Sequence, residues 1–281
     1  MIQAGFPRRS SSLRRGRWLV RAVFIAATAL PSVGGSHTLG AQIAVDELEL
    51  RFALRPGATP LQTFRVSNES DSATQVTISL EDWDRDEAGK NQFYPLGKLS
   101  TSCRSRVVVS PTVFQLAPRS TQTIRVSVDS APAFKAGCYT ILFVETPRPP
   151  NAKAQSAIMY NIRYGVKVYA EPASLAESGE VEDVQIRRDS TKIDKASQAM
   201  SVLFHNTGNR HLLVRGTVEI RRTDNSLVSK VDVPEFPTLP AARRRVSVSL
   251  PKLGAGRYVL LALLDYGGRE IVAGQAELQV P

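Results

Sequence analysis

The stretch AIMYNIRYGVKVYAEP, residues 157–172, alternates apolar and polar side chains along most of its length. One face carries the apolar row Ile158, Tyr160, Ile162, Tyr164, Val166 and Val168. The opposite face carries Asn161, Arg163 and Lys167. This period-two alternation predicts a β-strand. A strand of about fifteen residues exceeds the usual five or six, which raises the question of what the surplus apolar row contacts.

The first 41 residues have the pattern of an export signal. Six arginines precede or enter the apolar run Trp18–Leu30, and small residues lead to a cleavage position near Gly40 or Ala41. We therefore expect residues 1–41 to be a signal peptide. RRGRWLV partly resembles a twin-arginine signal but lacks the full motif, so ordinary secretion is the favoured route.

The basic balance of the chain belongs mostly to this leader. The chain has 36 Lys and Arg against 26 Asp and Glu; without the six leader arginines, 30 basic residues face 26 acidic ones. The composition therefore does not indicate a nucleic-acid partner, and the run Arg243–Arg245 reads as a solvated strand start. The longest later apolar run, YVLLALLDY at 258–266, is too short to span a bilayer, so no stable membrane insertion is expected.

From Ile43 onward, short β-type runs are separated by turn residues at intervals of about ten. The small, polar segment ASLAESGE, residues 173–180, divides these runs into two sets. Seven strands at such spacing are typical of an immunoglobulin-like sandwich. The sequence therefore predicts an all-β chain of two immunoglobulin-like β-sandwich domains in tandem, at 42–170 and 171–281.

Cys103 and Cys138 are the two cysteines of the chain. In an oxidising compartment they would most simply form one disulfide, which closes a loop of about 35 residues and stabilises by roughly 3–4 kcal/mol. Two free, buried cysteines are the alternative. The spacing is far from that of a CxxC redox motif.

Patterns for catalysis or metal binding are weak in this sequence. His205 and His211 lie in HNTGNRH, which reads as a polar turn without the further ligands that zinc requires. DRDEAGK, residues 84–90, lacks the remaining ligands of an EF-hand and reads as a hairpin loop. No nucleophile elbow or phosphate-binding loop is present in the sequence. We expect no enzymatic activity, no cofactor and no metal.

Several motifs together resemble the PapD-like periplasmic chaperones of the chaperone/usher pathway, which assemble pili. The motifs are LRFALRPG (50–57), FRVSN (64–68), EDW (81–83), PTVFQLAP (111–118), TIRV (123–126), VKVYAEP (166–172), LFHNTGN (203–209) and LDYGG (264–268). Their order covers nearly the whole chain after the leader. Two features depart from that family: Ala170, Glu171 and Pro172 stand where it usually has Tyr-Arg-Pro, and its members commonly lack the cysteine pair.

The resemblance implies that the long strand, about 157–169, is donated to a pilin-like subunit that lacks a strand. In such β-augmentation, main-chain hydrogen bonds give affinity and alternate side chains fill an open apolar groove. The donor positions that the resemblance implies are Ile158, Tyr160, Ile162 and Tyr164. Val166 and Val168 are expected to pack inward in their own domain.

The resemblance also implies a cationic anchor. Family members hold the subunit's C-terminal carboxylate between the domains with an arginine of the first strand and a lysine near the end of the long strand. Counting back from the turn glycine gives Arg51, and counting back from the strand-ending proline gives Lys167. A buried carboxylate needs such charged donors, while exposed surface roles for both side chains are the alternative.

Two functions follow as hypotheses. The first is a periplasmic chaperone that binds and stabilises pilin-like subunits and passes them to an outer-membrane usher. The alternative is a structural or binding protein of the cell envelope, built on the same two sandwiches, with its long strand paired internally.

Overall fold

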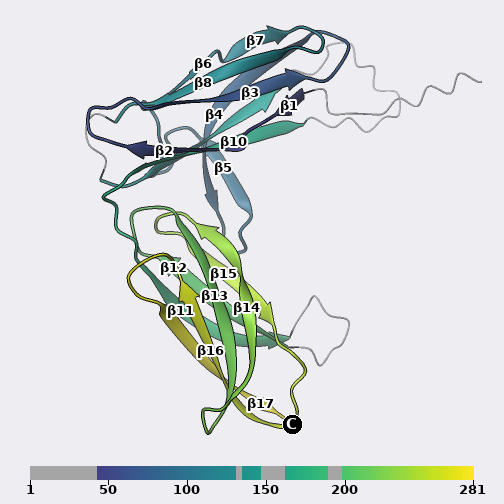
Figure 1. The fold of residues 1–281 in the computed structure, drawn as a ribbon, viewed down its shortest axis with the longest axis vertical. Coiled ribbons are helices and arrows are strands. Elements are labelled where there is room, and N and C mark those ends of the chain that lie inside the picture. The colour runs from purple at the N-terminus through teal and green to yellow at the C-terminus, as the bar shows by residue number, and fades with distance from the viewer. Residues whose placement is uncertain (1–42, 131–134, 147–161, 189–197) are drawn as a thin grey trace, which may run out of the picture. The chain divides into compact units, whose positions relative to one another are not determined.

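The computed structural model describes residues 43–130, 135–146, 162–188 and 198–281. Regular structure in these ranges is strand throughout, so the expected all-β class is confirmed. The strands form four sheets, two from residues 43–172 and two from residues 179–280 (Figure 1). The predicted signal peptide and residues 157–161 of the predicted donor strand lie outside the described ranges.

The first sheet has four antiparallel strands in the order β1–β3–β8–β6. They are β1 (Ile43–Val45), β3 (Leu61–Asn68), β8 (Thr121–Val128) and β6 (Val107–Ser110).

The second sheet has the order β2–β10–β9–β4–β5, and β7 also pairs with β4. Its strands are β2 (Glu49–Leu54), β10 (Arg163–Pro172), β9 (Cys138–Glu145), β4 (Thr74–Arg85), β5 (Asn91–Pro95) and β7 (Val113–Leu116). β2 and β10 run parallel, whereas the other pairs are antiparallel. The DRDEAGK segment is the β4–β5 hairpin, as expected.

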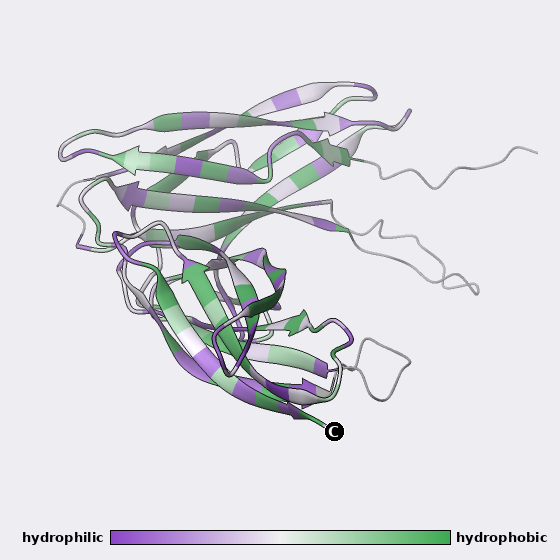
Figure 2. Cartoon of the chain, turned by 60° about the horizontal axis from the view of Figure 1, so that its bottom comes forward, coloured by the Kyte–Doolittle hydropathy of each residue, from purple (hydrophilic) through white to green (hydrophobic). Residues whose placement is uncertain are grey.

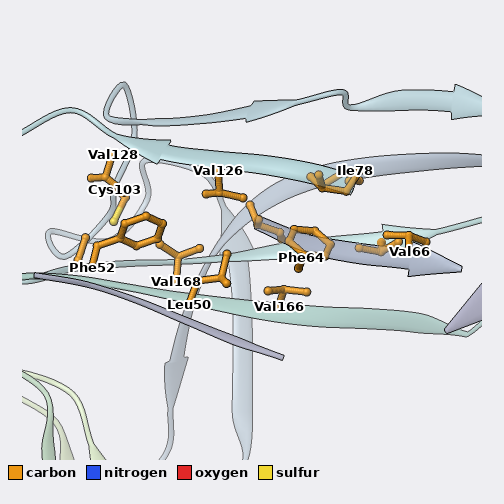
Figure 3. Close-up of a cluster of buried hydrophobic side chains, with 14 of the residues drawn as sticks. Leu50, Phe52, Phe64, Val66, Ile78, Cys103, Val126, Val128, Val166 and Val168 are labelled. Carbon is orange, nitrogen blue, oxygen red and sulfur yellow. The ribbon is translucent and has the colours of Figure 1, made fainter. Parts of the chain in front are cut away.

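One core lies between these two sheets, and it follows from the alternation of side chains along each strand. In β3, for example, Phe64 and Val66 are buried while Thr63 and Arg65 are exposed, and Figure 2 shows the same banding along the strands. The close-up in Figure 3 shows side chains from both sheets meeting in this core. Val166 and Val168 of β10 are fully buried there, which confirms the expectation that they pack inward.

Cys103 and Cys138 form a disulfide, with their Cα atoms 5.0 Å apart, and both side chains are buried in the first core. The loop that carries Cys103 is held by the buried carboxylate of Asp82. Asp82 accepts hydrogen bonds from the backbone N–H groups of Gly97 and Leu99 and from the Ser102 hydroxyl, at 3.0, 2.9 and 2.5 Å. Charge-assisted bonds to a buried carboxylate are among the strong ones in proteins, so this loop is firmly placed.

The other two sheets have the orders β11–β12–β15 and β14–β13–β16–β17. Their strands are β11 (Gly179–Arg188), β12 (Gln198–Asn206), β15 (Arg243–Ser249), β14 (Leu227–Thr238), β13 (Leu212–Arg222), β16 (Gly256–Asp265) and β17 (Val272–Val280). Met200, Phe204, Ile220 and Leu260 are fully buried in a second core. The structure therefore contains two sandwiches, each with its own core. Across the described ranges, no helix is long and apolar enough to cross a membrane.

Candidate functional site: the free edge of β10 and its cationic face

β10 is paired unevenly on its two sides. On one side it pairs with β9 along the register from Arg163↔Glu145 to Ala170↔Cys138. On the other side it pairs with β2 only from Lys167 to Pro172. The edge from Arg163 to Val166 therefore has no strand beside it among the described residues. An open edge of this kind presents main-chain groups to a further strand.

The core-facing row of β10 becomes exposed toward the same open end. Val168 and Val166 are fully buried, Tyr164 is half-buried against the first core, and Ile162 is 50% exposed just before the strand begins. These four residues share one face, as the alternation predicted. Ile162 and Tyr164 can thus offer apolar surface to a partner at the open edge, while the outcome for Ile158 and Tyr160 lies outside the described residues.

Arg51 and Lys167 lie on the opposite, outer face of the sheet. The parallel register pairs Lys167 with Glu49 and Tyr169 with Arg51. Leu50 of β2, which alternates with Glu49 and Arg51, is buried in the core. Residues two apart on a strand share a face, so the structure brings the two predicted anchor residues together on adjacent strands.

The two predicted anchor residues differ in their contacts. The Arg51 side chain is 56% exposed, pairs with Glu49 at 2.9 Å, and lies over the Tyr169 ring with its Cζ 4.6 Å from the ring centroid. The Lys167 ammonium lies 4.8 Å from the centroid of Trp83. Among the described residues, no carboxylate forms an ion pair with Lys167 at 4.0 Å or less.

Burial lowers the pKa of Lys167, the positive charge of Arg85 lowers it further, and Glu49 acts in the opposite sense. A half-buried ammonium is stabilised by an opposite charge. Arg163 offers a contrast further along β10, because its guanidinium pairs with Glu81 at 2.6 Å and with Glu145 at 3.6 Å. Among the described residues of β10, a cation without an ion pair is therefore found at Lys167 and not at Arg163.

We call the outer face of the sheet around Arg51 and Lys167 the cationic face. Aromatic side chains lie next to the cations of this face. We call the buried cluster Trp83, Tyr139, Ile141, Phe143, Tyr169 and Leu239 the aromatic layer. The Trp83 and Tyr139 rings each meet the Tyr169 ring edge-on, with centroids 5.8 Å apart. Arg85 adds a further cation, with its Cζ 5.4 Å from the Trp83 ring centroid. Cations over aromatic faces are attracted by the ring quadrupole, so the layer helps to hold several positive charges close together.

His211 borders this layer, with its ring centroid 4.9 Å from that of Tyr169. Burial, followed by the positive charges of Arg51, Arg85, Arg210 and Lys167, lowers the pKa of His211 to about 3. His211 is therefore neutral at neutral pH. Burial and the charge of Glu49 raise the pKa of Tyr169, which remains a phenol that can donate a hydrogen bond.

Arg85, Glu49 and the aromatic layer were not identified as site residues from the sequence. The EDW motif contains Trp83 and ends two residues before Arg85, but it carried no chemical assignment. Glu49 lies two residues before Arg51, and the period of a strand would have placed both on one face. That spacing was the signal available for Glu49.

The structure adds two carboxylates near His205, where the sequence showed no further metal ligands. Glu180 and Glu182 lie 3.3 and 2.9 Å from the His205 Nδ1 atom. Glu182 is also held by two hydrogen bonds from Arg243, at 2.7 and 2.8 Å. The Glu182 carboxylate is therefore already paired with Arg243, and the cluster is a network of charged side chains on β11, β12 and β15.

Residues 51–176 match the family model for pili and flagellar-assembly chaperones, PapD N-terminal domain. Residues 51–176 are therefore similar to a PapD N-terminal domain. The resemblance expected from the motifs is confirmed, and the family is one of chaperones and not of enzymes. No curated protein matches the chain by sequence.

Solved structures resemble more of the chain than the PapD family model covers. A chaperone–tip adhesin complex of CFA/I fimbriae biogenesis covers 86% of this chain and 100% of its own, with a TM-score of 0.50 and 16% identity. The class 5 fimbriae chaperone CfaA has a TM-score of 0.43 and 15% identity, covering 85% and 99% of the two chains. The Pseudomonas aeruginosa chaperone CupB2 has a TM-score of 0.40 and 16% identity, covering 85% and 100%. At 16% identity the first likeness shows the fold, two tandem immunoglobulin-like sandwiches.

Proposed function

We propose that this protein is a periplasmic chaperone that binds a pilin-like subunit along the open edge of β10 and holds the subunit's C-terminal carboxylate on Arg51 and Lys167. The observation that carries the proposal is the half-buried Lys167 ammonium, which has no carboxylate partner among the described residues and lies beside a second cation on the same face. The PapD N-terminal domain supports a chaperone role for pilin subunits.

The edge of β10 supplies the affinity of this proposed interaction. A partner strand beside Arg163–Val166 would satisfy main-chain groups that β2 leaves unpaired. Its apolar side chains would cover Ile162 and the exposed part of Tyr164. Covering a large apolar side chain is worth roughly 1.5–3 kcal/mol before ordering costs.

In this proposal the cationic face fixes the register of the partner strand against β10. A carboxylate that contacts Arg51 and Lys167 accepts charge-assisted hydrogen bonds, each worth about 1.5–3 kcal/mol. Because the anchor is on β2 and β10 at a fixed distance along the strand from the open edge, it would determine which residues of the partner lie beside Ile162 and Tyr164. Delivery of the subunit to an outer-membrane usher is the further step of this proposal.

Capture of a subunit tests the proposal. The full chain is co-expressed with a pilin-like subunit in a bacterial host, and complexes are isolated from the periplasm and weighed by native mass spectrometry. We expect a one-to-one complex with the wild type and at least about a tenfold loss of complex with Arg51→Ala or Lys167→Ala, since either change removes a charge-assisted contact.

Arg119→Ala and Lys230→Ala are the matched controls. Arg119 pairs with the exposed Asp71, and Lys230 lies on β14, is half-exposed and is 3.9 Å from Glu219. Both should leave capture unchanged. Undiminished capture by the Arg51 and Lys167 variants would contradict the anchor, and a wild-type monomer from cells that export the subunit would favour a structural envelope protein.

A further inference from the structure

We infer that Glu49 is an internal carboxylate that competes with the partner's carboxylate for Arg51, and so sets the selectivity of the cationic face. This inference rests on the proposed function and identifies a residue that regulates the same site. In the free protein the position that a ligand carboxylate would take on Arg51 is already held by the chain itself.

The contacts of Glu49 place it at the centre of the site. Its Oε2 atom lies 2.9 Å from Nη2 of Arg51, and its Oε1 atom accepts a hydrogen bond from the Tyr169 hydroxyl at 3.5 Å. In the parallel register Glu49 is directly opposite Lys167, while Arg51 is opposite Tyr169. One carboxylate thus contacts the Arg51 guanidinium and the Tyr169 phenol, and it stands at the strand position opposite Lys167.

The charges around Glu49 explain why an external anion can still bind. Arg51, Arg85 and Lys167 contribute three positive charges, and Glu49 is the carboxylate in the described ranges that forms an ion pair with any of them. The face therefore keeps a positive excess after Glu49 is counted. Burial keeps His211 neutral, so it neither adds to this excess nor offsets it.

The Glu49–Arg51 pair can be exchanged because it is open to water. The two side chains are 44% and 56% exposed, and an exposed ion pair is worth only about 0–1 kcal/mol. A lone carboxylate has to displace Glu49 and gains little, whereas a partner that also pairs with the β10 edge gains many further contacts. Glu49 therefore leaves a small free anion too weakly bound to occupy the face, whereas a carboxylate at the end of a bound strand can still displace it.

Binding of a labelled peptide tests this role. The probe is a short synthetic peptide with apolar residues at alternate positions and a fluorophore at its N-terminus, made with a C-terminal acid or a C-terminal amide. Fluorescence anisotropy gives its affinity for the full chain. We expect Glu49→Gln to bind the acid form about two- to fivefold more tightly than the wild type, as removal of an exposed competing pair allows.

The amide form should bind the wild type and Glu49→Gln equally, since it has no terminal charge. Glu47→Gln is the matched control, because Glu47 is exposed just before β2 and the same charge is removed outside the site. Thermal melts confirm that each variant is folded. Unchanged or weaker binding of the acid form by folded Glu49→Gln would overturn the inference and make Glu49 a residue that orients Arg51.

Failure of the proposed function gives a different result. If the wild type binds the acid and amide forms equally, or neither form, the carboxylate anchor itself is wrong and the inference falls with it. If the wild type prefers the acid and Arg51→Ala loses that preference while Glu49→Gln does not strengthen it, the anchor stands and only the role of Glu49 fails.

Discussion

The pKa of the buried His211 side chain reflects both its burial and the positive charges of the site. Its pKa lies near 3 because it is buried and faces the charges of Arg51, Arg85, Arg210 and Lys167. In the unfolded chain the same imidazole titrates near 6.5. Below pH 6.5 the unfolded state binds a proton at this imidazole that the folded state does not. The free energy of unfolding is therefore highest above pH 6.5 with respect to this group, and it decreases as the pH falls toward 3.

We therefore predict that His211→Phe reduces the pH dependence of stability. Between pH 8 and pH 5 the free energy of unfolding of the wild type should fall by about 2 kcal/mol more than that of the variant. Phenylalanine keeps an aromatic ring against Tyr169, so packing is largely retained. Urea unfolding at both pH values measures the difference, and parallel pH profiles would show that His211 is solvated or charged in the folded protein.

β10 combines two different roles in one element. Lys167–Ala170 are paired on both sides, and Val168, Tyr169 and Ala170 are buried, whereas the start of the strand has one paired side and an increasingly exposed apolar row. The same alternation places Val166 in the core and, in the proposed function, leaves Ile162 for a partner. The change of role occurs within four residues because β2 begins to pair with β10 only at Lys167.

This division predicts opposite effects for one substitution at two positions. Ile162→Asp should change the free energy of unfolding by less than about 0.5 kcal/mol, since the side chain is half-exposed, yet reduce subunit capture about tenfold or more. Val166→Asp should destabilise the fold by about 3 kcal/mol or more, because it buries an unpaired charge. Urea unfolding and native mass spectrometry separate the two effects.

Leu61→Asp is the control for Ile162→Asp, because Leu61 is a similarly exposed apolar residue at the start of β3. It should leave both stability and capture unchanged. Normal capture by Ile162→Asp would mean that the open edge of β10 is not where the partner binds.

Alternation along the chain was enough to predict most elements, but not their neighbours. The β-type runs of each half form strands, and the predicted hairpin loop at 84–90 leads into β5. β1 and β7 were not predicted as strands, because they are only three and four residues long and too short to show a period. Alternation assigns a residue to a face and leaves the strand beside it open. The parallel pairing of β2 with β10, which sets Glu49 opposite Lys167, is therefore a result of the structure.

Sequence motifs predicted the site residues that lie within those motifs, but not the residues that reach the site from elsewhere in the chain. Arg51 and Lys167 were located by counting from a glycine and a proline, and the structure places them on adjacent strands, although their binding role remains a prediction. Arg85 reaches the site because β4 continues past its pairing with β9, which ends at Glu81, and carries Trp83 into the aromatic layer, with Arg85 over the Trp83 ring. That tertiary proximity has no signature in the local sequence.

At the scale of the whole molecule, the two sandwiches have separate cores, and the disulfide belongs to one of them. Cys103 and Cys138 are 35 residues apart in the chain. A disulfide that closes such a loop stabilises by roughly 3–4 kcal/mol in the chain-entropy model. That constraint acts on the unfolded state of the first sandwich. Loss of the disulfide should therefore lower the free energy of unfolding of the first sandwich more than that of the second.

We predict that the double variant Cys103→Ser, Cys138→Ser increases hydrogen exchange in β9 and leaves exchange in β13 close to the wild-type rate. Exchange through global opening of a sandwich reports its free energy of unfolding, so peptides from the two strands measure the two sandwiches separately. Reductant should reproduce the β9 effect in the wild type and do nothing to the double variant. Equal acceleration in β9 and β13 would show instead that both sandwiches open as one cooperative unit, with the disulfide stabilising the chain from Ile43 to Pro281.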